Sequence, residues 1–173
     1  MKTKFQLRYP SKDIECWAER YENDDSRILP LVPIVQAREF LTKHELLTVC
    51  RWKTGCKRGL WQNNTPDFIR DVTQCAFNSD SERLRIEVLT LLRGVNWSTA
   101  TVLMHFFHPH AYPIMDHRAV WSLKASVPSA FQFEFWMEYT NYCRSLSTKH
   151  AISMRTLGRS LWQFSKENQP QRW

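Results

Sequence analysis

Glycine and regular alternation are both scarce in this sequence. Only four of its 173 residues are glycine, and few stretches alternate apolar with polar side chains. All-β domains depend on tight turns and on that alternation. The small number of glycines and the lack of alternation therefore argue against an all-β fold and favour an all-α fold.

Long hydrophobic runs are also missing. No stretch approaches the roughly 20 apolar residues that a membrane-spanning helix needs. The first residues, MKTKFQLRYPSKDIECW, contain no apolar segment long enough for a signal peptide. We therefore expect a globular, cytoplasmic protein with no membrane partner, associated with the nucleoid if its source is a bacterium.

The cysteines are few, odd in number and dispersed. No two of them form a Cys-x-x-Cys pair, so the sequence predicts neither a disulfide framework nor a compact zinc or iron–sulfur site. We expect reduced thiols that serve mainly in packing. They are Cys16, Cys50, Cys56, Cys75 and Cys143.

Acidic residues are outnumbered by basic ones. Lys and Arg number 24 against 17 Asp and Glu, which gives a formal net charge of +7 at pH 7. A basic protein surface favours polyanionic partners such as nucleic acid or anionic lipid.

Helix-start signals, by contrast, are abundant. Thr42 and Glu45 in TKHE form a capping box, and the apolar series that follows them ends at Gly55. Thr65 precedes Pro66, which suits an N-cap followed by the first helical position. These patterns predict helices that begin near residues 42 and 65.

Further helices follow from the same logic. Ser79 and Glu82 in SDSE repeat the capping-box pattern. We expect one all-α domain over residues 1–173 with about seven helices and an irregular polar segment at 1–30, or two small helical lobes with the active site between them. Apolar residues at helical spacing mark these faces: Phe68, Val72, Cys75 and Ala76; Leu84, Val88, Leu91 and Leu92; Ala100, Leu103, Met104 and Phe107; Phe135, Tyr139, Tyr142 and Leu146; Met154, Leu157, Leu161 and Phe164.

Residues 91–100, LLRGVNWSTA, predict a tight hairpin between two helices. Gly94 can turn through positive φ without a Cβ penalty, and Asn96 is the next best residue for a left-handed position. Val95 would then pack between the two helices. The second helix would start with N–H groups facing outward, a geometry that suits a phosphate. An ordinary glycine-capped turn is the alternative.

The segment YPIMDHRAVWSL places Asp116 just before apolar Ala119 and Val120. This spacing predicts a helix N-cap or first-turn carboxylate. Asp116 follows Ser98 by 18 residues (116 − 98), and the stretch 98–116 is long enough for one helix and a return loop. Beside a phosphate site, an anion held by a helix dipole would suit positive charge developing on a sugar. Capping alone is the alternative interpretation.

The stretch LRGVNWSTATVLMHFFHPHAYPIMDHRAV resembles the helix-hairpin-helix DNA glycosylase superfamily. In that family the hairpin reads Leu-x-Gly-Val-Gly, and a helix, a loop and an essential Asp follow. Leu92, Gly94 and Val95 match the hairpin. Thr99 and Ala100 match the start of the second helix, and Asp116 matches the acid in register. The flanking segments resemble more loosely small members related to oxoguanine glycosylases.

Departures from the family pattern shape what the resemblance implies. The second hairpin glycine is Asn96 here, which can loosen the affinity for DNA. Ser98 stands where bifunctional members carry Lys, and a hydroxyl cannot form a Schiff base, so no strand cleavage through that residue is expected. The tail LGRSLWQFSKENQPQRW has no cysteine, so no iron–sulfur cluster is expected. A structural monovalent cation at the hairpin carbonyls is compatible with the family.

The resemblance implies a monomeric enzyme that hydrolyses the N-glycosidic bond of a base flipped out of double-stranded DNA. Asp116 would stabilise the oxocarbenium-like transition state, and Ser98 would occupy the family's Lys position. The segment CRWKTGCKRGLWQNN interleaves cations with tryptophans, which suits phosphate neutralisation and stacking; a basic loop beside a core Trp is the alternative. DNA contacts are expected at Arg51, Lys53, Lys57, Arg58, Trp61, Arg93, Gly94, Val95, Asn96, Ser98, Thr99 and Arg118.

Three histidines support a rival hypothesis. His105, His108 and His110, together with Asp116, offer imidazole and carboxylate groups that suit zinc or iron. Aromatic residues interleave with them, which favours packing roles instead. The leading hypothesis is thus a monofunctional DNA glycosylase without a metal. The alternatives are a non-catalytic helix-hairpin-helix DNA-binding module and a metal-dependent hydrolase.

Overall fold

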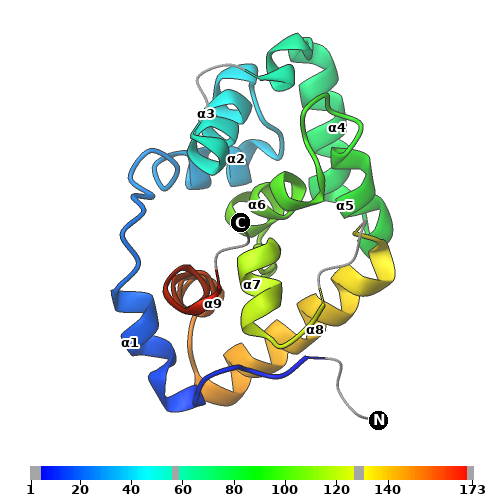
Figure 1. Cartoon of the computed structure of the whole chain (residues 1–173). Helices are drawn as coiled ribbons and strands as arrows, with labels where there is room; N and C mark the ends of the chain where they lie inside the picture. The colour runs from blue at the N-terminus through cyan, green and yellow to red at the C-terminus, as the bar shows by residue number, and fades with distance from the viewer. Residues whose placement is uncertain (1–4, 56–58, 127–130, 171–173) are drawn as a thin grey trace. The chain divides into compact units, whose positions relative to one another are not determined.

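The computed structural model describes residues 5–55, 59–126 and 131–170. Within these ranges the chain forms nine α-helices and two short 3-10 helices and contains no strand (Figure 1). The expected all-α class is confirmed. The segment expected to be irregular, 1–30, instead contains a helix, because a helix as short as Ile14–Glu19 (α1) shows too little periodicity to be found from sequence.

The chain folds into two compact units. One unit comprises residues 1–23 together with 112–173, and the other comprises residues 24–111. No helix in the described ranges combines the length and apolar character that crossing a membrane requires.

The first unit is organised around its C-terminal helix, α9, which contacts α1, α7 and α8. Two buried hydrogen bonds attach α9: Tyr9 Oη to Ser160 Oγ at 2.7 Å, and Ser122 Oγ to the Leu161 carbonyl at 2.6 Å. The elements of this unit are η1 (Ser11–Asp13), α1 (Ile14–Glu19), α7 (His117–Ser122), α8 (Phe133–His150) and α9 (Met154–Asn168).

The second unit is built on α6, in which eight of eleven residues are buried. Helix α6 contacts α2, α3 and α5. Its predicted apolar face is confirmed, since Ala100, Leu103, Met104 and Phe107 are all at most 1% exposed. The elements of this unit are α2 (Leu31–Arg38), α3 (Lys43–Thr54), η2 (Leu60–Asn63), α4 (Pro66–Asn78), α5 (Glu82–Leu89) and α6 (Trp97–Phe107).

The predicted capping signals at α3 and α4 are confirmed. Thr42 and Glu45 form a complete capping box, and α3 ends at Gly55 with φ of +69°. Thr65 caps α4, and Pro66 occupies its first turn.

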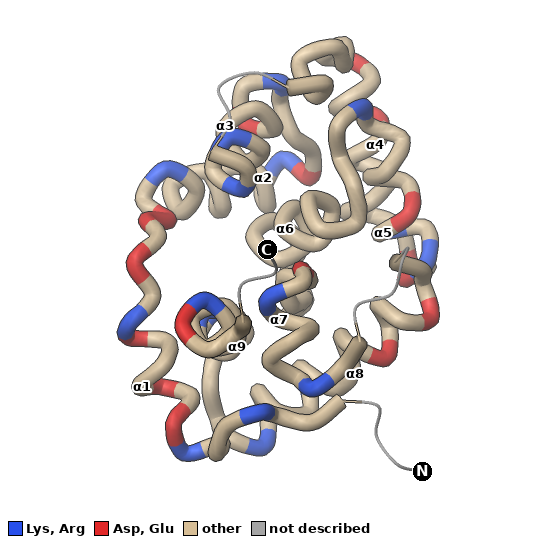
Figure 2. The backbone as a smooth tube through the Cα atoms, in the orientation of Figure 1, with Lys and Arg blue, Asp and Glu red and all other residues tan. Residues whose placement is uncertain are grey.

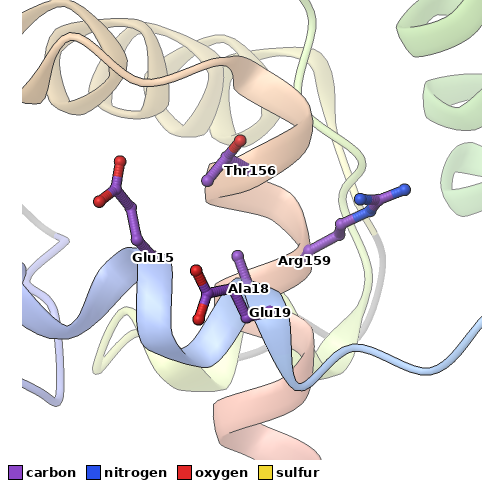
Figure 3. A pocket seen from close by; sticks show the side chains of 5 residues that line it. All are labelled: Glu15, Ala18, Glu19, Thr156 and Arg159. Carbon is purple, nitrogen blue, oxygen red and sulfur yellow. The ribbon is translucent and has the colours of Figure 1, made fainter.

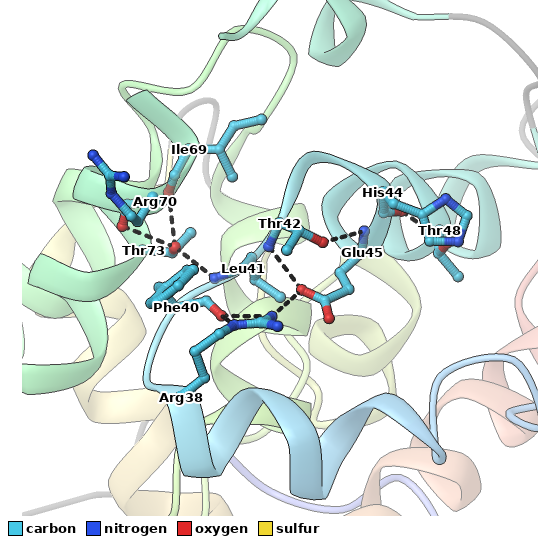
Figure 4. Close-up of polar contacts among 10 residues, drawn as sticks. All are labelled: Arg38, Phe40, Leu41, Thr42, His44, Glu45, Thr48, Ile69, Arg70 and Thr73. Atoms are coloured by element: carbon cyan, nitrogen blue, oxygen red, sulfur yellow. Dashed lines mark hydrogen bonds and ion pairs between the residues drawn. The ribbon is translucent and has the colours of Figure 1, made fainter. Parts of the chain in front are cut away.

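The turn that leads into α3 is held by side chains from three helices (Figure 4). The Glu45 carboxylate accepts the Thr42 N–H at 2.7 Å and pairs with Arg38. Thr73 Oγ1, on α4, accepts the Leu41 N–H at 2.9 Å and donates to the Ile69 carbonyl at 2.7 Å. The start of α3 is therefore fixed to both α2 and α4.

The predicted cap of α5 is wrong by two residues. Ser81 Oγ accepts the Leu84 N–H, whereas Ser79 is the C-cap residue of α4. The sequence SDSE contains two serines, and α4 runs on to Asn78, so only the second serine is placed to start the next helix.

The faces predicted for α4 and α5 are wrong in part. Phe68 is 42% exposed and Cys75 is also exposed, while Leu84 and Leu91 are 45% and 61% exposed. Each helix carries apolar residues on more than one side, so spacing alone did not select the buried side. The buried residues are Ile69, Val72, Thr73 and Ala76 on α4, and Arg85, Ile86 and Leu89 on α5.

Candidate functional site

The hairpin between α5 and α6 turns at Gly94, which has φ of +78°. The positive φ predicted for this residue is confirmed. Val95, the next residue, is 5% exposed, and its N–H donates to the Leu92 carbonyl at 3.0 Å. The hairpin is therefore a tight turn anchored by one buried valine.

Gly94 is also required by close packing. A Cβ on this residue would lie 2.7 Å from the backbone nitrogen of Trp61 and 3.2 Å from Leu60 Cβ. No side chain fits between the hairpin and η2, so glycine is needed here for space as well as for backbone conformation.

Asn64 clamps the hairpin and was not identified from the sequence. Its Oδ1 accepts the Arg93 N–H at 2.9 Å, and its Nδ2 donates to the carbonyls of Arg93 at 3.0 Å and Trp61 at 2.9 Å. The side chain is 3% exposed. Nothing in the dipeptide Asn63–Asn64 distinguishes the two amides, so no local pattern could have found this role.

Asn96 does not adopt the left-handed conformation expected of it. Its φ of −93° and ψ of 178° are extended, and it is the N-cap of α6: its Oδ1 accepts the Thr99 N–H at 3.0 Å. Asn is among the best N-cap residues, and Gly94 alone reverses the chain. Asn96, at the position of the family's second hairpin glycine, is therefore the N-cap of the second helix.

Backbone donors are available at this turn. In the part of the chain that the structure describes, the N–H groups of Gly94, Asn96 and Ser98 have no hydrogen-bond acceptor. Arg93 is exposed, Ser98 is half-buried, and Thr99 is buried. The carbonyls of Leu92 and Arg93 accept hydrogen bonds from the Val95 N–H and from Asn64 Nδ2.

Asp116 is the N-cap of α7, as predicted. Its Oδ1 accepts the Ala119 N–H at 3.0 Å, and Ala119 and Val120 after it are buried. The residue itself is half-buried. A carboxylate at this position is stabilised as an anion by the helix dipole.

Tyr139 fixes the loop that carries Asp116, a role that the sequence did not indicate. Its hydroxyl donates to the Ile114 carbonyl at 2.8 Å, across 25 residues of sequence. Burial raises the pKa of Tyr139 well above its ordinary value of 10, and the charges of Cys143 and Asp116 add to the shift. The hydroxyl therefore stays protonated and keeps donating this bond.

Arg118 and the described cations of segment 51–61 lie on α7 and at the end of α3. Arg118 lies in the first turn of α7 with its guanidinium 5.2 Å from the Trp162 ring centroid. At the end of α3, Arg51 is exposed and Lys53 half-buried. Lys57 and Arg58 lie outside the described residues, as does Cys56.

Trp61 is 7% exposed, which leaves little of its ring for a base to stack on. Its indole packs against Gly59, where an added Cβ would lie 2.2 Å from the ring. Its burial corresponds to the core-Trp alternative. Its neighbour Leu60 is 65% exposed and lies beside Gly94.

The three histidines do not form a three-ligand group. His108 is 4% exposed, and its Nδ1 accepts the His110 N–H at 3.0 Å, which removes one ligand nitrogen. His105 contacts Phe106 edge-on, with ring centroids 4.9 Å apart. Among the residues described, no three or more His, Cys, Asp and Glu side chains gather in a way that could hold a metal ion.

The hairpin can donate backbone hydrogen bonds to an anion, and the α7 N-terminus presents a carboxylate. The hairpin belongs to the second unit and Asp116 to the first. No protein-family model, curated protein or solved structure matches this chain.

Proposed function

We propose that this protein is a monofunctional DNA glycosylase that removes a damaged, mismatched or modified base from double-stranded DNA. The observation that carries the proposal is the Gly94 turn: within the described residues, three N–H groups from Gly94 to the first turn of α6 have no acceptor. A glycine turn that opens a helix is a phosphate-binding geometry, and the same stretch of sequence carries the glycosylase-like acid, Asp116.

In this proposal the hairpin binds the DNA backbone. A phosphate would accept hydrogen bonds from the N–H groups of Gly94, Asn96 and Ser98, with the positive end of α6 behind it. The exposed Arg93 would add a charge-assisted contact. Val95 and Thr99, both buried, would support the turn rather than touch DNA.

Asp116 would act on the sugar. As the base leaves, positive charge develops on the deoxyribose, and a fixed carboxylate stabilises that charge. Ser98 cannot form a Schiff base, so the abasic product would keep an intact strand.

Leu60 is the residue that best suits insertion into the duplex. Its side chain is 65% exposed beside the hairpin, and an apolar side chain that enters the base stack stabilises the gap left by a flipped base. Trp61, only 7% exposed, would support this loop rather than stack on a base.

A base-release screen tests the proposal. Purified protein is incubated with duplexes that carry a panel of damaged, mismatched and naturally modified bases, and strands are analysed with and without alkali. We expect cleavage at one class of base only after alkali. Cleavage without alkali would contradict the role of Ser98, and binding without release from every substrate would favour the non-catalytic DNA-binding module.

A further inference from the structure

Four basic side chains of the first unit surround two aromatic rings. Arg118 of α7 and Lys166 of α9 lie over Trp162, at 5.2 Å and 5.6 Å from its ring centroid. Arg155 and Arg159 of α9 lie over Tyr21, at 5.1 Å and 5.6 Å. The two rings meet edge to face, with centroids 5.3 Å apart. We call Arg118, Arg155, Arg159 and Lys166 the cationic face.

The sequence of α9 places these groups on one side of the helix. Arg155, Arg159, Trp162 and Lys166 are spaced by four, three and four residues, the spacing that aligns side chains along a helix. Basic segments on α9 and at the start of α7 are visible in Figure 2.

The aromatic rings prepare the basic groups for binding anions. A guanidinium that lies over a ring has restricted motion, which lowers the entropic cost of binding. Planar N–H pairs match the oxygens of phosphate in a bidentate geometry. The Arg155 guanidinium is further held by a 3.3 Å hydrogen bond to Tyr21 Oη.

Carboxylates also lie close to these basic groups. Glu22 pairs with Lys166 at 2.9 Å, and both side chains are exposed. Glu15 and Glu19 line a cavity of about 370 Å³ together with Arg159 (Figure 3).

The chemistry of the surroundings favours nucleic acid over a membrane as the polyanion. A membrane-binding face needs exposed aliphatic or aromatic side chains that enter the lipid. Among the described residues, every large hydrophobic side chain that is markedly exposed lies between residues 24 and 111, outside the unit that carries the cationic face. Three of the four cations are arginines, the residue that suits phosphate recognition on nucleic acids.

We propose that the cationic face binds backbone phosphates of DNA and forms a second contact surface in addition to the hairpin. The choice of DNA as the polyanion rests on the proposed function, whereas the charge and geometry of the face do not. Arg118 follows Asp116 by two residues, so this face would engage the DNA strand on which Asp116 acts.

The test measures affinity for duplex DNA by fluorescence anisotropy across a series of salt concentrations. Arg118→Gln and Arg155→Gln are compared with Lys149→Gln, an equal charge change at an exposed position near the end of α8. Each face variant should weaken binding about fivefold at 0.15 M salt and lower the salt slope by about 0.9 per lost phosphate contact. Lys149→Gln should change affinity by less than about twofold. Arg118→Lys should restore the slope but not the full affinity.

Melting temperatures equal to that of the wild type exclude unfolding as the cause. Face variants that bind DNA like Lys149→Gln would overturn the proposal. So would binding to vesicles containing about one quarter phosphatidylserine that the face variants lose while their DNA binding is unchanged. If the wild type releases no base but the face variants still lose affinity, the glycosylase proposal fails and the cationic face stands.

Discussion

At the scale of single residues, three glycines differ in whether they need positive φ and in whether they have room for a Cβ. Gly94 has positive φ and no room for a Cβ; Gly55 has positive φ of +69° but open space; Gly158 lies inside α9 with open space and no positive φ. Backbone strain and steric exclusion can therefore be measured apart in one molecule.

We predict a graded series for substitution by alanine. Gly94→Ala should destabilise the protein by about 2 kcal/mol or more, since strain and overlap with Trp61 add. Gly55→Ala should cost about 1 kcal/mol from strain alone. Gly158→Ala should stabilise by about 0.5–1 kcal/mol, because alanine is the better helix former. Urea unfolding measures all three, and equal losses at Gly94 and Gly55 would refute the close approach to Trp61.

Asn64 supplies a second prediction. Asn64→Ala removes three hydrogen bonds that hold Arg93 and Trp61 and should cost about 1–3 kcal/mol of the free energy of unfolding. Asn63→Ala is the matched control, because Asn63 is exposed, and it should change stability by less than about 0.5 kcal/mol. Similar losses in both variants, measured by urea unfolding, would show that the clamp contributes nothing.

At the scale of elements, local signals predicted where helices start far better than which side they bury. Thr42 with Glu45, Thr65 with Pro66, and Asp116 are caps that depend on neighbours within three residues. The buried face of α4 depends instead on distant partners, such as the Leu41 N–H that Thr73 accepts across 32 residues. Such partners leave no trace in local spacing. The role of Asn96 could not be decided from sequence, because asparagine suits both a left-handed turn position and a helix N-cap.

The bond between Thr73 and Leu41 can be tested with an isosteric change. Thr73→Val keeps the volume but leaves the buried Leu41 N–H without its acceptor, which should cost about 1–3 kcal/mol. Thr48→Val is the control: its hydroxyl only donates to the His44 carbonyl of its own helix, so the loss should be below about 0.5 kcal/mol. Thermal unfolding of both variants measures the difference, and a neutral Thr73→Val would contradict the anchoring of α3 to α4.

At the scale of the whole molecule, the sequence predicted the all-α class and the turn through positive φ at Gly94. The bounds of the two units, the clamp at Asn64 and the hold of Tyr139 on the loop before Asp116 were not predicted. All three depend on contacts between residues far apart in the chain. Periodicity and capping report only contacts within a few residues.

Buried thiols give the molecule a defined response to alkaline pH. Burial raises the pKa of Cys50 and of Cys143 from the ordinary value of 9 to about 12. The unfolded chain therefore releases these protons before the folded one, so stability is retained below pH 9 and falls as the pH rises toward 12. Urea unfolding from pH 8 upward should show this fall, with a smaller slope in Cys143→Ala. A stability that rises over this range would contradict the burial of both thiols.

The most direct test of the glycosylase proposal compares base release by the wild type and by Asp116→Asn under single-turnover conditions. Asparagine caps helices as well as aspartate does, so this variant should keep the α7 N-cap, the melting temperature and the affinity for DNA. We predict that its rate of base release falls by at least about a hundredfold, since the charge opposite the developing oxocarbenium is lost. Release at the wild-type rate by Asp116→Asn would contradict the catalytic role of this carboxylate.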